Sequence, residues 1–390
     1  MRIRSVRTHI LRVKLGKDRF YSSQSVFPER NSLLVRVETE DGLVGWGEGG
    51  QYGPPEPVAS CINDVFSPLI IGADASRIGV IWDLLYSRSR DFGQKGSYIE
   101  AISALDIALW DIQGKSLGVP IHQLLGGAFR ESVAAYATGG YYSEDEYRSG
   151  KPDLKRLATQ LQGFAALGFP AVKMKIGLLP VEHDARRIEA AREAVGPDMT
   201  ILVDCNHAYN STTAIRIGRT LERNRIGWME EPVPPEDRDG YRRVRSQLSI
   251  PIAGGECEYT RFGFRDFIAG QCADIAQPDV CVCGGLSEFL KICGLASSYG
   301  IQTVPHVWGS GVAFHAALHA VAAIPPCPYT VSPVILQNEP MIEYDQSPNP
   351  LRDGLLRNSI KLEDNRIKIP TKPGLGIELD EDMIREYEGV

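Results

Sequence analysis

Three acidic residues lie at the ends of three successive strand-like segments in the middle of the chain. Asp204 ends TILVD, Glu230 lies in GWMEEP and Glu256 ends IPIAGGE, each 26 residues after the one before. This interval fits one strand, one helix and two loops. In a parallel barrel the strand ends meet on one face, so the three carboxylates are expected to lie together. One such acid alone is more often a cap, but three at matched positions predict a Mg²⁺ site.

Two lysines occupy alternate positions of the preceding strand-like segment, 172–176. Alternation puts Lys173 and Lys175 on one face of the strand and the apolar residues on the other, so the lysines are expected inside the barrel. Mutual repulsion and burial are expected to lower a lysine pKa toward the range of a general base. Two solvated surface lysines are the alternative, which is disfavoured on a strand buried on both faces.

The residues next to the acids follow the same alternation. Asn206 is expected on the face of Asp204, and His207 could reach a substrate from the same strand end. Glu231 is expected to point away from Glu230 and to be paired outside the metal site.

An aspartate and a histidine end the next two strand-like segments. Asp279 lies in QPDVCVCGG and His306 in VPHVWGSG. An Asp that holds a His fixes its tautomer and raises its basicity, which suits a general acid or base. The alternative for this pair alone is a capping Asp and a structural His.

Together these groups predict one kind of reaction. A metal on three carboxylates would hold a substrate carboxylate, with lysines on one side and the His–Asp pair on the other. The arrangement suits removal of a proton α to a carboxylate. Two bases on opposite faces allow either proton transfer at one carbon or abstraction followed by loss of a β-oxygen.

The order of the elements predicts an α/β fold. The segments 2–15 and 32–49 are strand-like, and the second contains a hairpin signal at residues 40–42. Helical segments follow, including residues 98–117. From Val133 seven strand–helix units alternate, and an eighth strand is expected around 341–344. This order favours a parallel barrel over an open doubly wound sheet, since no glycine-rich dinucleotide loop opens a helix.

The composition limits the classes of partner molecule and the compartment expected for this protein. The net charge of −7 argues against nucleic acid as a main partner. The N-terminus lacks the apolar core of a signal peptide and no apolar run reaches membrane-spanning length, so a cytoplasmic protein without membrane contact is expected. Eight scattered cysteines predict reduced thiols, and Cys281 and Cys283 are expected to be packed thiols rather than zinc ligands.

These motifs, in this order, resemble the enolase superfamily and within it the mandelate racemase subgroup. The resemblance covers nearly the whole chain and implies a modified (β/α)7β TIM barrel with an N-terminal α+β capping domain. It implies a capping (lid) domain at 1–130, the barrel at 131–350 and a C-terminal segment at 351–390 that returns to the capping domain. The pattern of residues 361–374 by itself indicates a strand that returns to the N-terminal unit.

The resemblance also implies roles for single residues. Mg²⁺ would be held by the three acids, Lys175 would be the base with Lys173 beside it, and His306 with Asp279 would act on the other face. Glu343 would hydrogen-bond the substrate carboxylate.

The resemblance further extends to acid-sugar-processing members. It implies proton abstraction from an acid sugar or its lactone followed by β-elimination. Cycloisomerisation of a hexaro-1,4-lactone is favoured, and dehydration, racemisation and epimerisation remain alternatives. A homo-oligomer is expected by the same resemblance.

Substrate choice is expected to depend on two lid segments, residues 17–30 and 51–55. We expect Tyr21, Arg30, Tyr141 and Trp308 near the pocket, with Arg30 as a partner for a distal carboxylate.

Overall fold

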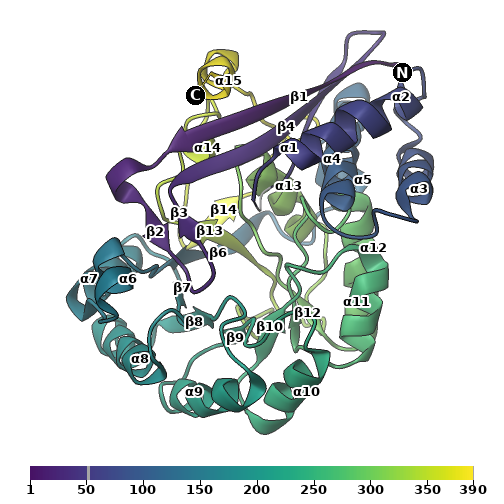
Figure 1. Ribbon diagram of the computed structural model, residues 1–390. Helices are drawn as coiled ribbons and strands as arrows, with labels where there is room; N and C mark the ends of the chain where they lie inside the picture. Colours follow the sequence, from purple (N-terminus) through teal and green to yellow (C-terminus); the bar gives the residue numbers. More distant parts are fainter. Residues whose placement is uncertain (51–52, 390) are drawn as a thin grey trace.

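The N-terminal part of the chain forms a small antiparallel sheet covered by helices (Figure 1). This computed structural model describes residues 1–50 and 53–389. The sheet order is β1–β4–β5, and a short hairpin of β2 and β3 projects from the connection between β1 and β4. The strands are β1 (Ile3–Lys14), β2 (Phe20–Tyr21), β3 (Val26–Phe27), β4 (Glu29–Thr39) and β5 (Val44–Gly49). The helices are η1 (Gly16–Asp18), α1 (Glu56–Ser60), the π-helix Cys61–Phe66, α2 (Ser67–Ile70), α3 (Ile78–Ser89), α4 (Ser97–Leu117) and α5 (Ile121–Leu124).

Helix α4 packs directly on β5, because β5 carries glycine at every position that faces the helix. A Cβ atom at Gly45 or Gly47 would overlap the backbone oxygen of Ala108 or Ala104. The close approach buries nearly the whole of α4 between the sheet and the barrel, including the apolar residues around Leu105.

The rest of the chain forms eight parallel strands that curl about a common axis, with helices around them (Figure 1). The order is β12–β11–β10–β9–β8–β7–β6–β13, and no ladder joins the end strands β12 and β13 in the described part of the chain. The strands are β6 (Ser132–Gly139), β7 (Ala171–Lys175), β8 (Thr200–Asp204), β9 (Met229–Glu230), β10 (Ile252–Gly254), β11 (Ile275–Ala276), β12 (Gln302–Thr303) and β13 (Met341–Asp345). Seven strand–helix units followed by an eighth strand confirm the predicted (β/α)7β order.

The helices follow the strands in the order expected for right-handed crossovers. They are α6 (Glu144–Ser149), α7 (Leu154–Ala166), α8 (Val181–Val195), α9 (Ser211–Arg223), α10 (Arg238–Gln247), α11 (Thr260–Ala269), α12 (Gly285–Ser298) and α13 (Gly311–Ala322). Several begin at side-chain caps, such as Asn210, which accepts a hydrogen bond from the Thr213 amide (2.9 Å) before α9.

Strand alternation divides the barrel residues into two cores. Outward residues such as Val203 pack against the helices, and inward residues such as Tyr136, Leu202 and Trp228 fill the barrel interior. The polar residues lie above this inner plug, at the carboxyl ends of the strands, which is the end where parallel barrels hold their active sites.

The tail runs differently from the sequence expectation. Its strand β14 (Arg366–Lys368) pairs antiparallel with the start of β6 and not with the N-terminal sheet. The reason is that β7 pairs only with residues 137–139 of β6, which leaves the first residues of β6 open on that side. The last elements are α14 (Pro350–Asp353) and α15 (Glu381–Glu388), and α15 lies against β1. No helix in the described residues is long and apolar enough to span a membrane.

Candidate active site

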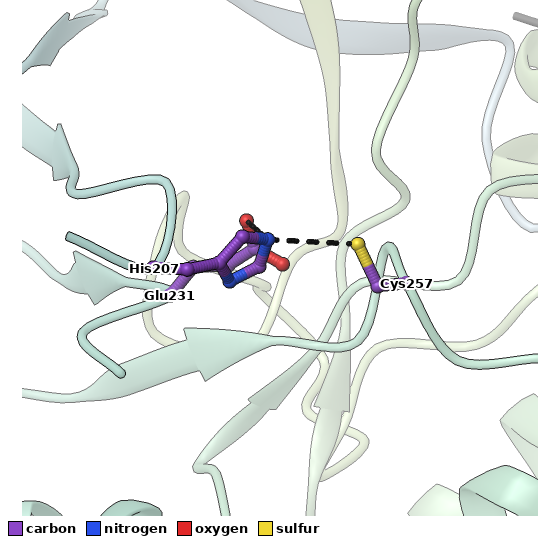
Figure 2. Close-up of side chains that lie close together, drawn as sticks. All are labelled: His207, Glu231 and Cys257. Carbon is purple, nitrogen blue, oxygen red and sulfur yellow. Dashed lines mark hydrogen bonds and ion pairs between the residues drawn. The ribbon is translucent and has the colours of Figure 1, made fainter. Parts of the chain in front are cut away.

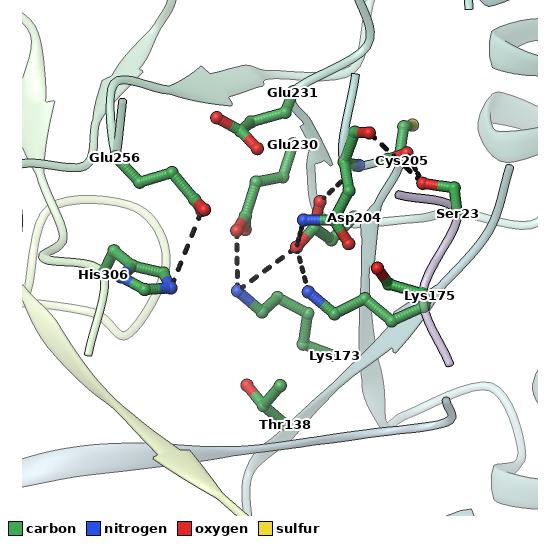
Figure 3. A network of polar contacts seen from close by, with 12 residues as sticks. Ser23, Thr138, Lys173, Lys175, Asp204, Cys205, Glu230, Glu231, Glu256 and His306 are labelled. Atoms are coloured by element: carbon green, nitrogen blue, oxygen red, sulfur yellow. Dashed lines mark hydrogen bonds and ion pairs between the residues drawn. The ribbon is translucent and has the colours of Figure 1, made fainter. Parts of the chain in front are cut away.

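The three predicted metal ligands lie together at the mouth of the barrel (Figure 3). Asp204 and Glu230 end β8 and β9 and are paired in register, and Glu256 follows β10. All three side chains are buried, and one oxygen from each lies within 4.8 Å of the others. Gly255 carries Glu256 into place with φ +118°, and a Cβ there would press on Phe264.

The donor set fits Mg²⁺. Every ligand atom is a carboxylate oxygen, which this hard cation prefers. Two oxygens at the site, Glu256 Oε2 and Asn206 Oδ1, are buried without a hydrogen-bond partner in the described residues. Buried oxygens of this kind are costly unless a cation or water meets them. Asp204, Glu230 and Glu256 would therefore hold the ion.

Both lysines of β7 point into the barrel beside these carboxylates, on the predicted face. Lys173 Nζ lies 2.6 Å from Glu230 Oε1, and Lys175 Nζ is ion-paired with Asp204. Lys173 is fully enclosed, whereas Lys175 lines the cavity described below. Lys175 is therefore the lysine that a substrate can touch.

The expectation that the lysine pKa values are lowered is wrong, because the carboxylate contacts raise them. Burial opposes the charged form, but the carboxylate of Glu230 holds the pKa of Lys173 well above its usual value. Likewise burial of Lys175 is outweighed by Asp204, and the pKa of Lys175 is raised. The two ammonium groups repel each other, but the fold also surrounds each of them with carboxylates, whose attraction is larger.

Glu343 lies below the lysines and outside the lining of the cavity. It contacts Lys173 Nζ at 2.8 Å, accepts a hydrogen bond from Thr138 Oγ1 at 2.5 Å and another from the Val307 amide at 3.3 Å. Because these three contacts occupy its oxygens, Glu343 is placed to hold the Lys173 ammonium group and not to contact a substrate directly. The nearby Glu339 pairs instead with Arg366.

His306 and Asp279 come together as expected from neighbouring strands. His306 Nδ1 lies 2.8 Å from Asp279 Oδ2, and its Nε2 lies 3.7 Å from Glu256 Oε2. Burial lowers the basicity of His306, but Glu256 and Asp279 outweigh it and raise the pKa of His306 to about 9. Figure 3 shows His306 and Lys175 on opposite sides of the carboxylates.

The residues that follow the acids leave the strand geometry at once. Asn206, His207 and Glu231 have φ values of +41°, +61° and +44°, in the left-handed region. The expectation that Glu231 points away from the site is therefore wrong, because β9 ends at Glu230 and the alternation ends with it. Glu231 turns back beside Glu230 and Glu256 (Figure 3). Its Oε2 atom lies 3.1 Å from His207 Nε2.

A cavity of about 510 Å³ opens above these groups, between the barrel mouth and the β2–β3 hairpin. Its lining from the barrel includes Lys175, Asn206, His207, Glu256, Cys257, Tyr259, His306, Tyr141 and Trp308. Its lining from the capping part includes Ser22, Gln24, Ser25, Val26, Phe27, Pro28, Glu29, Arg30, Asn31 and Gly53. The first predicted lid segment thus faces the site, and in the second segment Gln51 and Tyr52 lie outside the described residues.

Of the four expected lid contacts, Tyr21 is the exception. Tyr21 stacks on Tyr147 at a centroid distance of 4.9 Å and does not line the cavity. The preceding residue, Phe20, instead packs with Tyr141 and Trp308 at the cavity rim. Neighbouring residues of a strand point to opposite sides, and no local pattern in this two-residue strand indicates which of Phe20 and Tyr21 faces the cavity. Reasoning from sequence also missed Gln24, Phe27 and Tyr259, of which the first two lie inside the predicted lid segment.

Arg30 is held by the barrel more tightly than the sequence suggested. It is ion-paired with Asp345, bonds Ser347 Oγ at 2.6 Å, and lies over the Trp308 ring at 4.1 Å. Its Nη1 atom is buried and has no hydrogen-bond partner in the described residues. Arg30 therefore fixes the rim and keeps one donor for a ligand.

A parallel α/β barrel whose strand ends carry a carboxylate triad between a lysine and a histidine defines a class of metal-assisted proton-abstracting proteins. Residues 16–126 match the N-terminal domain of mandelate racemase and muconate lactonizing enzyme, and residues 156–383 match the enolase C-terminal domain-like family. The chain belongs to this mandelate racemase and muconate lactonizing enzyme family of the enolase superfamily.

Individual relatives are similar over their full length. The chain is 44% identical to a D-galactarolactone cycloisomerase of Agrobacterium fabrum, over 99% of both chains. It is 38% identical to an arabinonate dehydratase of Saccharolobus solfataricus, over 91% of this chain and 90% of that one. Among solved structures, the 3,6-anhydro-D-galactonate cycloisomerase of Zobellia galactanivorans is 39% identical, covers 99% of both chains and superposes with a TM-score of 0.86.

Proposed function

We propose that this protein is a Mg²⁺-dependent cycloisomerase that opens galactaro-1,4-lactone to a linear 3-deoxy-2-keto-hexarate. The observation that carries the proposal is the placement of Lys175 and His306 on opposite sides of one carboxylate triad, within a single cavity. The similarity to a galactarolactone cycloisomerase supports the choice of substrate.

The two lysines of β7 would have different roles in the reaction. Lys175 would take the proton from the carbon next to the free carboxylate, because it is the β7 lysine that reaches the cavity. Lys173, held between Glu230 and Glu343, would keep positive charge beneath the site. When bound, Mg²⁺ supplies positive charge that offsets the carboxylates and stabilises the negative charge that develops on the substrate during proton removal.

The second half of the reaction breaks the lactone ring. As the proton leaves, the bond between the β-carbon and the ring oxygen breaks, and the oxygen departs with the electron pair as the oxygen of a new carboxylate. His306, held by Asp279, stands on the side opposite Lys175 and would face this departing oxygen. The enol that forms then takes one proton at the former β-carbon to give the keto acid. No water enters, so substrate and product are isomers.

The test is proton NMR in D₂O with Mg²⁺ and galactaro-1,4-lactone. We expect the lactone signals to disappear, a 3-deoxy-2-keto acid to appear, and one deuterium to enter its C3 position. Lys175→Met should abolish this conversion, whereas Lys372→Met, at an exposed lysine, should not change it. Turnover that survives in Lys175→Met would show that another group is the base.

Dehydration of an open-chain acid sugar is the second candidate, favoured by the similarity to an arabinonate dehydratase. The same proton removal would then be followed by loss of hydroxide, protonated by His306. Keto acid formed from open-chain galactarate or an aldonate, with the lactone untouched, would establish this alternative. Exchange of the α-proton without keto acid would instead indicate a racemase or epimerase.

A further inference from the structure

A second group of metal-binding side chains lies beside the carboxylate triad (Figure 2). It is built from the residues that follow the triad along the same three strands. His207 comes after the end of β8, Glu231 after that of β9 and Cys257 after that of β10. The barrel therefore places an imidazole, a carboxylate and a thiol next to an all-oxygen site.

The distances between these groups match those of a single tetrahedral ion. His207 Nε2 lies 3.6 Å from Cys257 Sγ and 3.1 Å from Glu231 Oε2. One ligand atom from each residue lies within 4.8 Å of the others. Around a tetrahedral Zn²⁺, with its usual bond lengths, the sulfur and nitrogen ligands are about 3.5 Å apart and the nitrogen and oxygen ligands about 3.4 Å.

The surroundings of Glu231 indicate a bound cation independently of these distances. Its side chain is 1% exposed, yet neither carboxylate oxygen accepts a hydrogen bond from the described residues, and the ion-pair contact of Oε2 is with His207 Nε2, itself a candidate ligand. Nδ1 of His207 is also without a partner there. Burying a carboxylate that accepts no hydrogen bond costs free energy, and a cation between Glu231, His207 and Cys257 would reduce that cost.

The donor atoms of His207, Glu231 and Cys257 favour a softer ion than the Mg²⁺ expected at the carboxylate triad. Thiolate and imidazole ligands select Zn²⁺ and similar ions, whereas the neighbouring oxygen triad suits Mg²⁺. His207 and Cys257 both line the cavity, so an ion can enter from it. Three protein ligands would leave the fourth position of a tetrahedral ion for water or a ligand.

We propose that His207, Glu231 and Cys257 form a second divalent-cation site that takes Zn²⁺ and is separate from the Mg²⁺ site. On binding, the Cys257 thiol gives its proton to solvent and its sulfur bonds the ion. An ion held there stands in the wall of the substrate cavity.

The test measures binding and does not depend on turnover. The full-length protein, saturated with Mg²⁺, is titrated with Zn²⁺ by calorimetry, and Co²⁺ is used as an absorbing probe. We expect one Zn²⁺ per chain that excess Mg²⁺ does not displace, and a thiolate-to-cobalt charge-transfer band in the near ultraviolet. Cys257→Ser should remove the band and weaken Zn²⁺ binding by more than about tenfold, because a ligand is lost.

Two further variants make the test specific. Cys327→Ser, at the other cysteine that is only partly buried, should keep both the band and the Zn²⁺ affinity. His207→Gln should weaken Zn²⁺ binding as Cys257→Ser does, and provides the test if the serine variant does not fold. Zn²⁺ that Mg²⁺ competes away, or a cobalt band that survives Cys257→Ser, would overturn the proposal.

Discussion

Glu48 joins the capping sheet to the segment that carries His306, and its loss should loosen that segment. Glu48 lies in β5 and is fully buried. Its carboxylate accepts hydrogen bonds from Ser32 Oγ (2.7 Å), Ser310 Oγ (2.5 Å), and the backbone amides of Ser310 and Ala313 (2.9 Å each). These two amides begin α13, where helices leave their N–H groups without internal partners and favour an anion.

The expected size of the effect follows from these bonds. In Glu48→Ala the Ser310 and Ala313 amides stay buried without an acceptor, at about 1–3 kcal/mol each. The two serine hydroxyls can turn elsewhere, and the cost of burying the carboxylate, which raises the pKa of Glu48, disappears. We therefore expect the first turn of α13 to open with about 3 kcal/mol less free energy, which is about a hundredfold in the opening equilibrium.

Native-state hydrogen exchange measures this directly. The Ser310 and Ala313 amides in Glu48→Ala should exchange about a hundredfold faster than in the parent protein, while amides of α9 keep their rates. Because Ser310 lies four residues after His306, kcat should fall as well. Ser32→Ala is the matched control: it removes one bond to Glu48 and leaves both helix amides paired, at about 1 kcal/mol. Exchange at Ser310 and Ala313 within about threefold of the parent rate would mean that Glu48 does not hold the first turn of α13.

Three further predictions test other parts of the fold. Burial raises the pKa of Asp106 to about 7, so its contribution to stability is full below about pH 4 and is lost as the pH rises through about 7. Between pH 4 and 8 the thermal midpoint of Asp106→Asn should therefore fall less than that of the parent protein. Parallel curves of midpoint against pH would contradict this. Gly47→Ala should destabilise the capping domain by more than about 2 kcal/mol, because the new Cβ meets the Ala104 oxygen. Urea unfolding followed by tryptophan fluorescence measures the loss, and a smaller value would mean that α4 can shift. Arg30→Lys should lower kcat/KM by about tenfold, since lysine cannot keep both the Asp345 pair and the ring contact; unchanged kinetics would remove Arg30 from substrate binding.

The order of strands and helices could be predicted from the sequence because each element carries its own periodic pattern. The helix predicted at 98–117 is found at Ser97–Leu117, and the eight-strand order followed from the alternation of strand and helix segments. The positions of Asp204, Glu230 and Glu256 followed from the same pattern, because parallel strands end on one face whatever the details of their packing.

The points where sequence reasoning failed all depend on contacts between distant segments. The pKa values of Lys173 and Lys175 are raised because Glu230 and Asp204, from other strands, stand beside them. The tail strand pairs with β6 because β7 leaves the start of β6 open, which no local pattern records.

Strand alternation and repeat length are local properties of the chain, so they were enough to predict the barrel, the acidic triad, and the places of Lys175 and His306 beside it. Only the tertiary structure decided that Glu231 turns back to meet His207, that Tyr21 faces away from the cavity, and that Arg30 is held by Asp345. Each of these depends on which side chains from distant parts of the chain come within reach when the barrel strands and the capping hairpin have packed.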